Sequence, residues 1–272
     1  MELHLSDRDK IAENKRLWDA RVKGHVASSF YDVPGFLKGE CALKYPEVDA
    51  LGDVKGQTML HLQCHFGLDT LSWARRGAIV TGMDFSGTAI AKARELTVEA
   101  CLEATFVECA VYDLPQHLAG KFDIIFVSYG ALIWLPDLER WADVVDQFLK
   151  PGGRLCIAEF HPHWYGLNWD TYQIEYPYFN SGEAFEEVAT KSYAGSDEYA
   201  GMREFFWSHS LSETIQPLLK RGIQIRHFEE YTFSPYNAFP NLLEIRPGEW
   251  IPATLAEGKV AMMFTLVGQK DD

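Results

Sequence analysis

Polar side chains that could contact a nucleotide follow two apolar segments of this chain. The run 58–62 (TMLHL) leads into the loop 63–69, and the run 79–84 (IVTGMD) ends at Asp84. Parallel strands that are covered on both faces have apolar runs of this kind, and nucleotides bind beyond their carboxyl ends. An acid about 20 residues after the first loop can accept both ribose hydroxyls. We therefore predict that Asp84 binds a ribose; the alternative is that it only caps a turn or a helix.

Strands and helices must alternate if these two segments are to end at one edge of a sheet. The sequence alternates in this way from residue 58 to residue 160, and a further helix with two strands follows near the C-terminus. This spacing predicts a parallel, doubly wound sheet. The expected strands are 58–62, 79–84, 105–108, 122–127, 154–160, 223–231 and 259–268, and the expected helices are 69–76, one capped by Ser86 or Thr88, 138–149 and 212–221.

Two segments lie outside this alternation. Residues 7–22 have the pattern of an amphipathic helix, and 25–57 are irregular with short helical pieces. The insertion 161–207 is rich in aromatic residues and Glu, and its segments 171–178 and 184–193 resemble the two arms of an antiparallel pair. We expect a single domain over 1–272, made of a helical N-terminal segment (1–57), the core (58–160), the insertion (161–207) and a C-terminal helix and strand pair (208–272).

The net charge of −14 restricts the partners that the chain can bind. Nucleic-acid binding requires clustered Lys and Arg, and an anionic membrane repels an acidic surface, so a small or cationic partner is expected. The five cysteines form no CxxC pair and fit free thiols in a reducing compartment. The charged N-terminus lacks the apolar run of a signal peptide, and the apolar stretch 124–135 is too short to cross a bilayer. These features favour a cytoplasmic location.

Five segments, in order, resemble the class I methyltransferases that use S-adenosylmethionine (SAM). They are MLHLQCHFGLDTLSWARRGA, VTGMDFS, FVECAVYDLP, FDIIFVSYGALIWLPD and FLKPGGRLCIAEFHP, and together they run from about residue 58 to residue 160. LQCHFGLDTLSWARRGA and WDARV…FYDVPGFL are similar to a bacterial subgroup that acts on small molecules. The resemblance implies a Rossmann-like, mostly parallel seven-stranded sheet with an antiparallel last strand. It also implies SAM as cofactor, S-adenosylhomocysteine (SAH) as product and an N-terminal helical lid over the cofactor.

The glycine-rich loop of this family is altered here. If Gly67 is aligned with the last loop glycine, His61, Gln63 and His65 stand where the family has an acid and two glycines. Gln63 and His65 could bind the methionyl carboxylate or amine, or they could only stabilise the loop. Ala110 replaces the usual adenine-binding acid, which leaves that contact to the backbone at Val111 and Tyr112, or to Asp113. The resemblance thus places the cofactor against Leu62, Gln63, His65, Gly67, Asp84, Phe85, Val111, Tyr112 and Ser128, with Trp18 and Arg21 contributed by the lid.

Methyl transfer from a sulfonium is an in-line displacement that depends mainly on alignment. A general base is required only if the acceptor carries a proton at neutral pH. His161 follows the last core strand and is our candidate base, although a packed or capping histidine is the alternative. The pair His161 and His163 lacks a convincing third ligand, so we expect no metal site.

These observations favour an enzyme that methylates a small molecule at oxygen or nitrogen. A SAM-binding regulatory protein without catalysis is the first alternative. An NAD(P)-dependent oxidoreductase is the second, and the missing G-x-G-x-x-G fingerprint argues against it. Nucleic-acid methylation is disfavoured by charge and by SYGA at 128–131 in place of an NPPY-type tetrad. The aromatic insertion could wall the acceptor pocket or form a homodimer contact.

Overall fold

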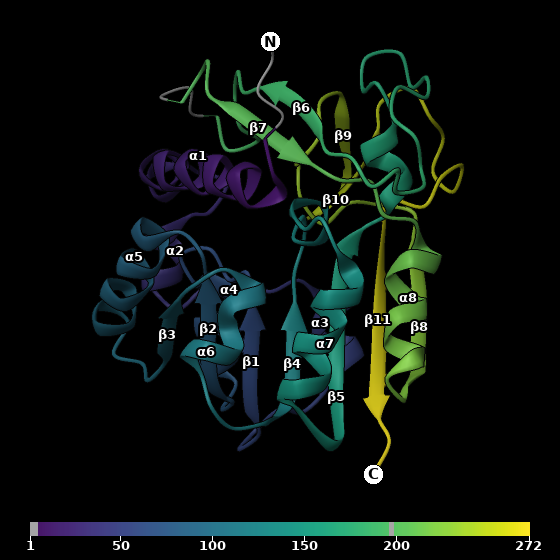
Figure 1. Cartoon of the computed structure of the whole chain (residues 1–272). Coiled ribbons are helices and arrows are strands. Elements are labelled where there is room, and N and C mark those ends of the chain that lie inside the picture. Colours follow the sequence, from purple (N-terminus) through teal and green to yellow (C-terminus); the bar gives the residue numbers. More distant parts are fainter. Residues whose placement is uncertain (1–4, 196–198) are drawn as a thin grey trace.

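Seven strands form the central sheet in the order β3-β2-β1-β4-β5-β11-β8 (Figure 1). The computed structural model describes residues 5–195 and 199–272. Strand β11 runs antiparallel to both of its neighbours, and the pairs from β3 to β5 are parallel. This confirms the expected mostly parallel sheet with an antiparallel last strand. The strands are β1 (Thr58–Leu62), β2 (Ile79–Asp84), β3 (Thr105–Glu108), β4 (Phe122–Val127), β5 (Leu149–Phe160), β8 (Ile223–Tyr231) and β11 (Met263–Lys270).

Alternate residues of the central strands face opposite layers of helices. In β4, Ile125 and Val127 pack with the cluster that contains Trp141 and Leu218, whereas Ile124 and Phe126 pack with Trp73. Both faces are therefore buried, which explains why the strand is apolar from Ile124 to Val127. The helices of the core are α3 (Tyr45–Leu51), α4 (Leu68–Arg75), α5 (Gly87–Glu99), α6 (Leu114–His117), α7 (Leu138–Phe148) and α8 (Leu211–Lys220), with the 3₁₀ turns η1 (Val111–Asp113) and η2 (Leu132–Trp134).

Some predicted bounds need correction. Strand β5 begins at Leu149 instead of residue 154. Leu149 already pairs with β4, and the KPGG segment between Leu149 and Arg154 forms an irregularity in the register of the two strands. Strand β11 begins at Met263, so 259–262 belong to the preceding loop. That loop also contains an unpredicted hairpin of β9 (Leu242–Arg246) and β10 (Glu249–Pro252).

The pairing predicted for the insertion is wrong. Strand β6 (Phe185–Val188) lies in the expected second arm, but its partner is β7 (Arg203–Phe206). The expected first arm, 171–178, contributes only an isolated bridge between Leu167 and Ile174 after the 3₁₀ turn η3 (Pro162–Gly166). Partner choice depends on contacts over the whole insertion, which alternation within one segment cannot reveal.

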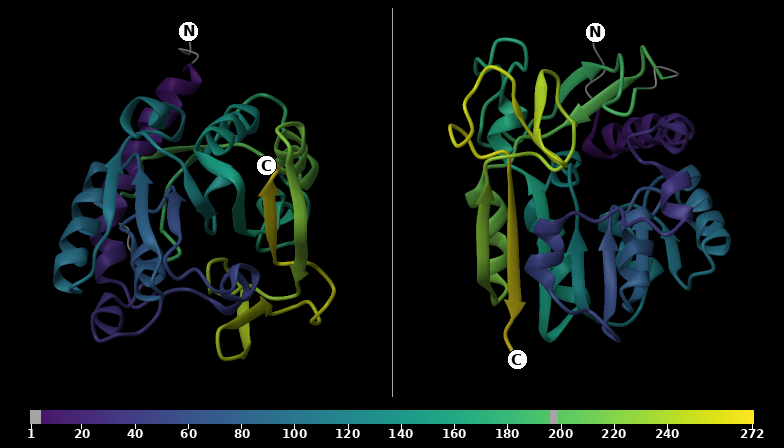
Figure 2. Two further views of the ribbon diagram at one scale, coloured as in Figure 1. Left: turned by 90° about the horizontal axis from the view of Figure 1, so that it is seen from below. Right: turned by 180° about the vertical axis from the view of Figure 1, so that it is seen from behind.

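A second layer of structure covers the carboxyl ends of the parallel strands. Helix α1 (Asp7–Ala27), the β6–β7 hairpin and the β9–β10 hairpin gather above this edge, and the views in Figures 1 and 2 agree on this. Ser6 begins α1 with a capping box, and α2 (Val33–Leu37) follows it. No helix in the described part of the chain is long and apolar enough to span a bilayer. The covered edge is the one at which the sequence places its candidate site.

Candidate active site

The loop after β1 has a glycine-like backbone without the usual glycines. Gln63, His65 and Gly67 have φ values of 55°, 49° and 81°. Side chains with a Cβ rarely adopt this left-handed region, whereas glycine adopts it freely. The two positions at which the resemblance expects glycine thus keep the conformation of glycine, which supports the alignment at Gly67.

Asp84 connects this loop to the end of β2. Its Oδ2 accepts a hydrogen bond of 2.8 Å from the backbone N–H of His65, and its Oδ1 accepts one of 2.9 Å from Ser86. Burial raises the pKa of Asp84 to about 6, and these two hydrogen bonds oppose the increase. Each carboxylate oxygen retains a lone pair for a further donor.

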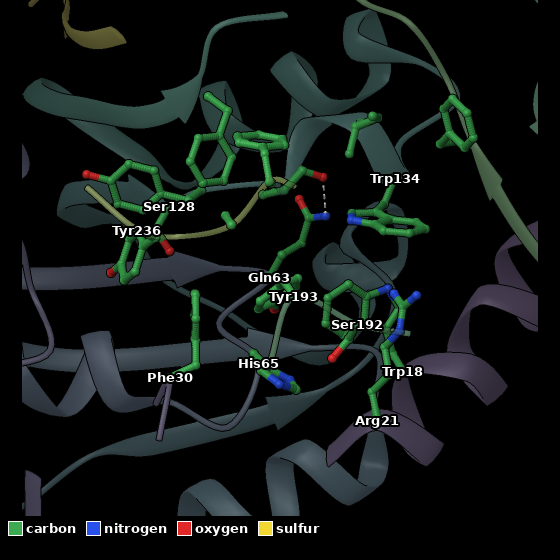
Figure 3. A pocket seen from close by; sticks show the side chains of 18 of the residues that line it. Trp18, Arg21, Phe30, Gln63, His65, Ser128, Trp134, Ser192, Tyr193 and Tyr236 are labelled. Atoms are coloured by element: carbon green, nitrogen blue, oxygen red, sulfur yellow. Dashed lines mark hydrogen bonds between the residues drawn. The ribbon is translucent and has the colours of Figure 1, made fainter. Parts of the chain in front are cut away.

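A cavity of about 1090 Å³ extends along the covered edge of the sheet. In Figure 3, Trp18, Arg21 and Trp134 lie together on one side of it, Ser128 and Tyr236 lie on the opposite side, and Gln63 lies between them. Leu62 is the exception among the predicted cofactor residues, because its side chain is fully buried in the core cluster beneath the loop. The predicted residues that line the cavity are Trp18, Arg21, Gln63, His65, Gly67, Asp84, Phe85, Val111, Tyr112 and Ser128.

His61 organises the floor of this cavity from within the sheet. Its Nδ1 lies 2.8 Å from Thr70 Oγ1 and its Nε2 lies 3.0 Å from Ser128 Oγ. Burial lowers the pKa of His61 to about 3, so the imidazole is neutral at physiological pH. Ser128 is also hydrogen-bonded to the Asp69 carboxyl group. A neutral histidine thus occupies the place of the usual acid and orients two polar groups of the cavity.

Helix α1 and the β6–β7 hairpin close over the loop together. The Trp18 ring packs edge-on against His65, with ring centres 5.3 Å apart. Arg21 forms an ion pair of 2.8 Å with Glu204 of β7, and its guanidinium lies 5.0 Å from the Trp18 ring centre. The protein itself therefore supplies a carboxylate partner for Nη2 of Arg21, a residue that we predicted to lie against the cofactor. His25 Nδ1 lies 3.0 Å from His65 Nε2, which ties the lid to the loop.

Two buried polar atoms near the loop have no partner among the described residues. They are Oε1 of Gln63 and Nε of Arg21. The Gln63 amide nitrogen, in contrast, donates a 2.9 Å hydrogen bond to the carbonyl of Ala131. One unpaired acceptor and one unpaired donor are what the ammonium and carboxylate of an amino acid require.

Comparison with known proteins agrees with this geometry. A family model described as a methyltransferase domain matches residues 60–155. The solved SAM-dependent methyltransferase from Methanosarcina mazei is similar in fold, with a TM-score of 0.55 and 20% identity, and the match covers 84% of this chain and 98% of that protein. The one from Mesorhizobium loti has a TM-score of 0.53 and 20% identity, and the match covers 86% of this chain and 100% of that protein. Residues 60–155 of this chain therefore match a methyltransferase domain, and the fold around them is that of SAM-dependent methyltransferases.

Curated relatives match about half of this chain. The ubiquinone biosynthesis O-methyltransferase of Cronobacter sakazakii is 28% identical over 158 residues, which are 56% of this chain. An uncharacterized methyltransferase of Synechocystis sp. is 31% identical over 136 residues, which are 50% of this chain. The matches span 64% and 62% of the lengths of these two relatives.

Beyond the predicted cofactor residues, the cavity becomes aromatic. Tyr236 stacks on Phe30 with ring centres 5.4 Å apart and meets the edge of Tyr129 at 5.1 Å. Tyr129 lies 5.4 Å from Phe160, which contacts Phe239 at 4.8 Å. We call this set the ring wall: Phe30, Tyr129, Phe160, Tyr236 and Phe239. It borders the part of the cavity that lies beyond the predicted cofactor residues.

His161 does not line this cavity. Phe160 does, and successive side chains of a strand point to opposite faces. The imidazole is directed at β8, where its Nε2 lies 2.9 Å from Glu230 Oε1. Burial and the neighbouring His163 lower the pKa of His161 to about 4. This geometry gives the predicted base no contact with the acceptor region.

Glu159 is a residue whose position the sequence did not indicate. It is 4% exposed, and its carboxylate accepts hydrogen bonds from the backbone N–H groups of Gly130, Ala131 and Leu132. These bonds fix the loop after β4, which carries part of the cavity wall. An acid within the otherwise apolar run 155–160 was the available signal, but its orientation was not evident from alternation alone.

Proposed function

We propose that this protein transfers the methyl group of SAM to a small-molecule acceptor, at oxygen or nitrogen. One observation carries the proposal: residues from five separate segments, predicted to bind the cofactor from the sequence, line a single cavity. That cavity continues past them into the ring wall, so it has room for a second molecule. A regulatory protein that only bound SAM would not need this additional compartment.

The residues present fit SAM at each of its ends. Asp84 can accept the ribose hydroxyls, and the backbone at Val111 and Tyr112 lines the expected adenine position. The unpaired Oε1 of Gln63 suits the methionyl ammonium, and the unpaired Nε of Arg21 suits the carboxylate. SAM, when bound, supplies a methyl group on a positively charged sulfur. The contribution of the chain is then to align the acceptor and to exclude water from the cavity beneath the two lids, which are helix α1 and the β6–β7 hairpin.

Calorimetry with SAM and SAH tests the binding part of this proposal. We expect both to bind, and Asp84→Ala to weaken both while the melting temperature stays close to that of the unmodified protein. Glu95→Ala, in an exposed acid of α5 outside the cavity, is the matched control and should bind normally. Transfer of a radiolabelled methyl group to pools of small metabolites tests catalysis. Absence of binding by both ligands would refute the proposal.

A further inference from the structure

Glu47 is a buried carboxylate that has no role in the binding of SAM described above. It is 0% exposed at the first turn of α3. Its Oε1 accepts a 2.5 Å hydrogen bond from the backbone N–H of Lys44, and its Oε2 accepts one of 2.6 Å from the hydroxyl of Tyr129. Over residues 5–195 and 199–272, no Lys or Arg side chain forms an ion pair with it. A glutamate that only capped the helix would not need burial against a tyrosine 82 residues away.

Tyr129 is the member of the ring wall that adjoins the predicted cofactor residues, because it follows Ser128 in the sequence. It follows Ser128 directly at the end of β4, and its side chain lines the cavity. Within the described part of the chain, Glu47 is the hydrogen-bond partner of its hydroxyl, so the oxygen retains lone pairs that can accept a proton. The tyrosine therefore connects the cavity to the buried carboxylate behind it.

We propose that Tyr129 and Glu47 form a proton relay that takes the hydroxyl proton of an aromatic acceptor while its oxygen is methylated. The inference rests on the proposed function. The acceptor oxygen forms a bond to the methyl carbon as the carbon–sulfur bond breaks, and the electron pair of that bond remains on sulfur. The hydroxyl proton moves to Tyr129 Oη, and the proton of Tyr129 moves to Glu47. The sulfonium charge and the carboxylate charge are both neutralised, so charge balances.

The surroundings of Tyr129 favour an aromatic hydroxyl compound over an amine. The ring wall offers faces and edges to a planar ring. The Lys44 ammonium lies 4.6 Å from the centre of the Tyr236 ring and lines the same cavity. A positive charge at this place stabilises an oxygen that becomes negative and repels an amine that arrives protonated.

The relay predicts how turnover depends on pH. Burial raises the pKa of Glu47 to about 8, whereas the hydrogen bonds from Tyr129 and Lys44 lower it. The other groups that act on Glu47 or are affected by its charge are Asp69 of α4, Tyr236 and Cys156 of β5, and Arg154 of β5 lies beside the end of α3. A proton acceptor must be ionised, so turnover should rise as pH increases towards about 8 and level off above it.

Matched acceptors test the substrate class. Phenol and catechol, each supplied with methyl-labelled SAM, should become labelled, whereas cyclohexanol and cyclohexylamine should not. Calorimetry should show phenol binding to the complex of the protein with SAH. If SAH binds but neither phenol nor catechol is labelled, or if cyclohexanol is labelled equally, the inference is overturned while the proposed function stands. Loss of SAM and SAH binding would instead refute the proposed function.

Two substitutions test the relay itself. Glu47→Gln and Tyr129→Phe should each lower kcat with phenol roughly 100-fold, with little change in SAH affinity. Tyr45→Phe, at an exposed tyrosine of α3 outside the cavity, is the control and should leave kcat unchanged. Unchanged kcat in either relay variant would overturn the proposal. The unmodified protein gives a check that needs no variant, because a turnover that did not change with pH around 8 would also overturn the proposal.

Discussion

At the scale of residues, the site keeps conformations that ordinary side chains avoid. Gln63 and His65 both lie in the left-handed region, at a cost of roughly 1–2 kcal/mol each. Contacts from separate parts of the chain hold them there: Ala131 accepts from the Gln63 amide, and His25 lies against His65. Strain of this kind persists only where the surroundings determine it, and it is concentrated at functional sites. The loop thus lacks the conformational freedom of glycine at these two positions, but it gains two side chains that reach the cavity.

The ribose assignment of Asp84 makes SAH binding sensitive to acid. The pKa of its carboxyl group is raised to about 6, so the group becomes protonated as pH falls through that value and accepts hydrogen bonds less well. We expect SAH affinity to be constant between pH 7 and about 8 and to decrease below about 6. Calorimetry at a series of pH values measures this dependence. Asp84→Asn should bind weakly at every pH, and a wild-type profile without a decrease near 6 would contradict the assignment.

Some residue positions could be predicted from the sequence because they depend on local order. Asp84 ends a strand, and that position alone directs it to the edge of the sheet. The predictions for Leu62 and His161 failed because one step along a strand turns a side chain to the other face of the sheet, and both of these side chains point away from the cavity. The role proposed for Glu47 depends on Tyr129, which joins it only after α3 packs against β5 and β11. No pattern near position 47 carries that information.

At the scale of elements, α1 is attached to the insertion by one buried asparagine. The Asn14 side chain donates a 2.7 Å hydrogen bond to the carbonyl of Phe205 and accepts one of 2.8 Å from its N–H. It thereby continues the hydrogen bonding of strand β7 with a side-chain amide. The two lids are therefore expected to open and close as one unit.

Asn14→Ala should separate these lids without unfolding the sheet. The substitution leaves a buried N–H and a buried C=O unpaired, at a cost of roughly 1–3 kcal/mol. We expect faster hydrogen exchange in α1 and β7, weaker SAH binding, and unchanged exchange in β1 and β4. Glu13→Ala, next to it on the more exposed side of α1, should change none of these. Slower exchange in β7, or exchange that increases equally in β4, would show that Asn14 does not connect the lids specifically.

The predicted strands β1 to β4 have the bounds that the structure gives them, whereas the insertion does not. Strands buried on both faces leave a strong local signal, since most of their residues are apolar and turn residues end the run. Strands β6 and β7 are half exposed and carry Glu and Arg on their outer face. Strand β7 also packs against α1, which is distant in the sequence, so the local sequence left the register of these strands open.

At the scale of the whole molecule, charge should distinguish the two ligands of the site. The chain carries a net charge of −14, and the exposed carboxylates of Glu175 and Glu187 line the cavity. SAM has a net positive charge at neutral pH, whereas SAH has none, although the two are otherwise nearly identical. An acidic protein attracts the cation from a distance, and salt screens this attraction over about 10 Å at 0.1 M.

We therefore expect the association rate of SAM to fall as salt is raised, and that of SAH to remain nearly constant. Stopped-flow fluorescence can follow both, because Trp18 and Trp134 line the cavity and report its occupation. Glu175→Lys should slow SAM association at low salt and flatten its salt dependence, with little effect on SAH. Glu99→Lys, at an exposed position of α5 away from the cavity, changes the net charge equally and separates the effect of local charge from that of total charge. Equal salt dependences for SAM and SAH would mean that the acidic surface does not guide the cofactor, and the net charge would then have to serve another purpose, such as solubility.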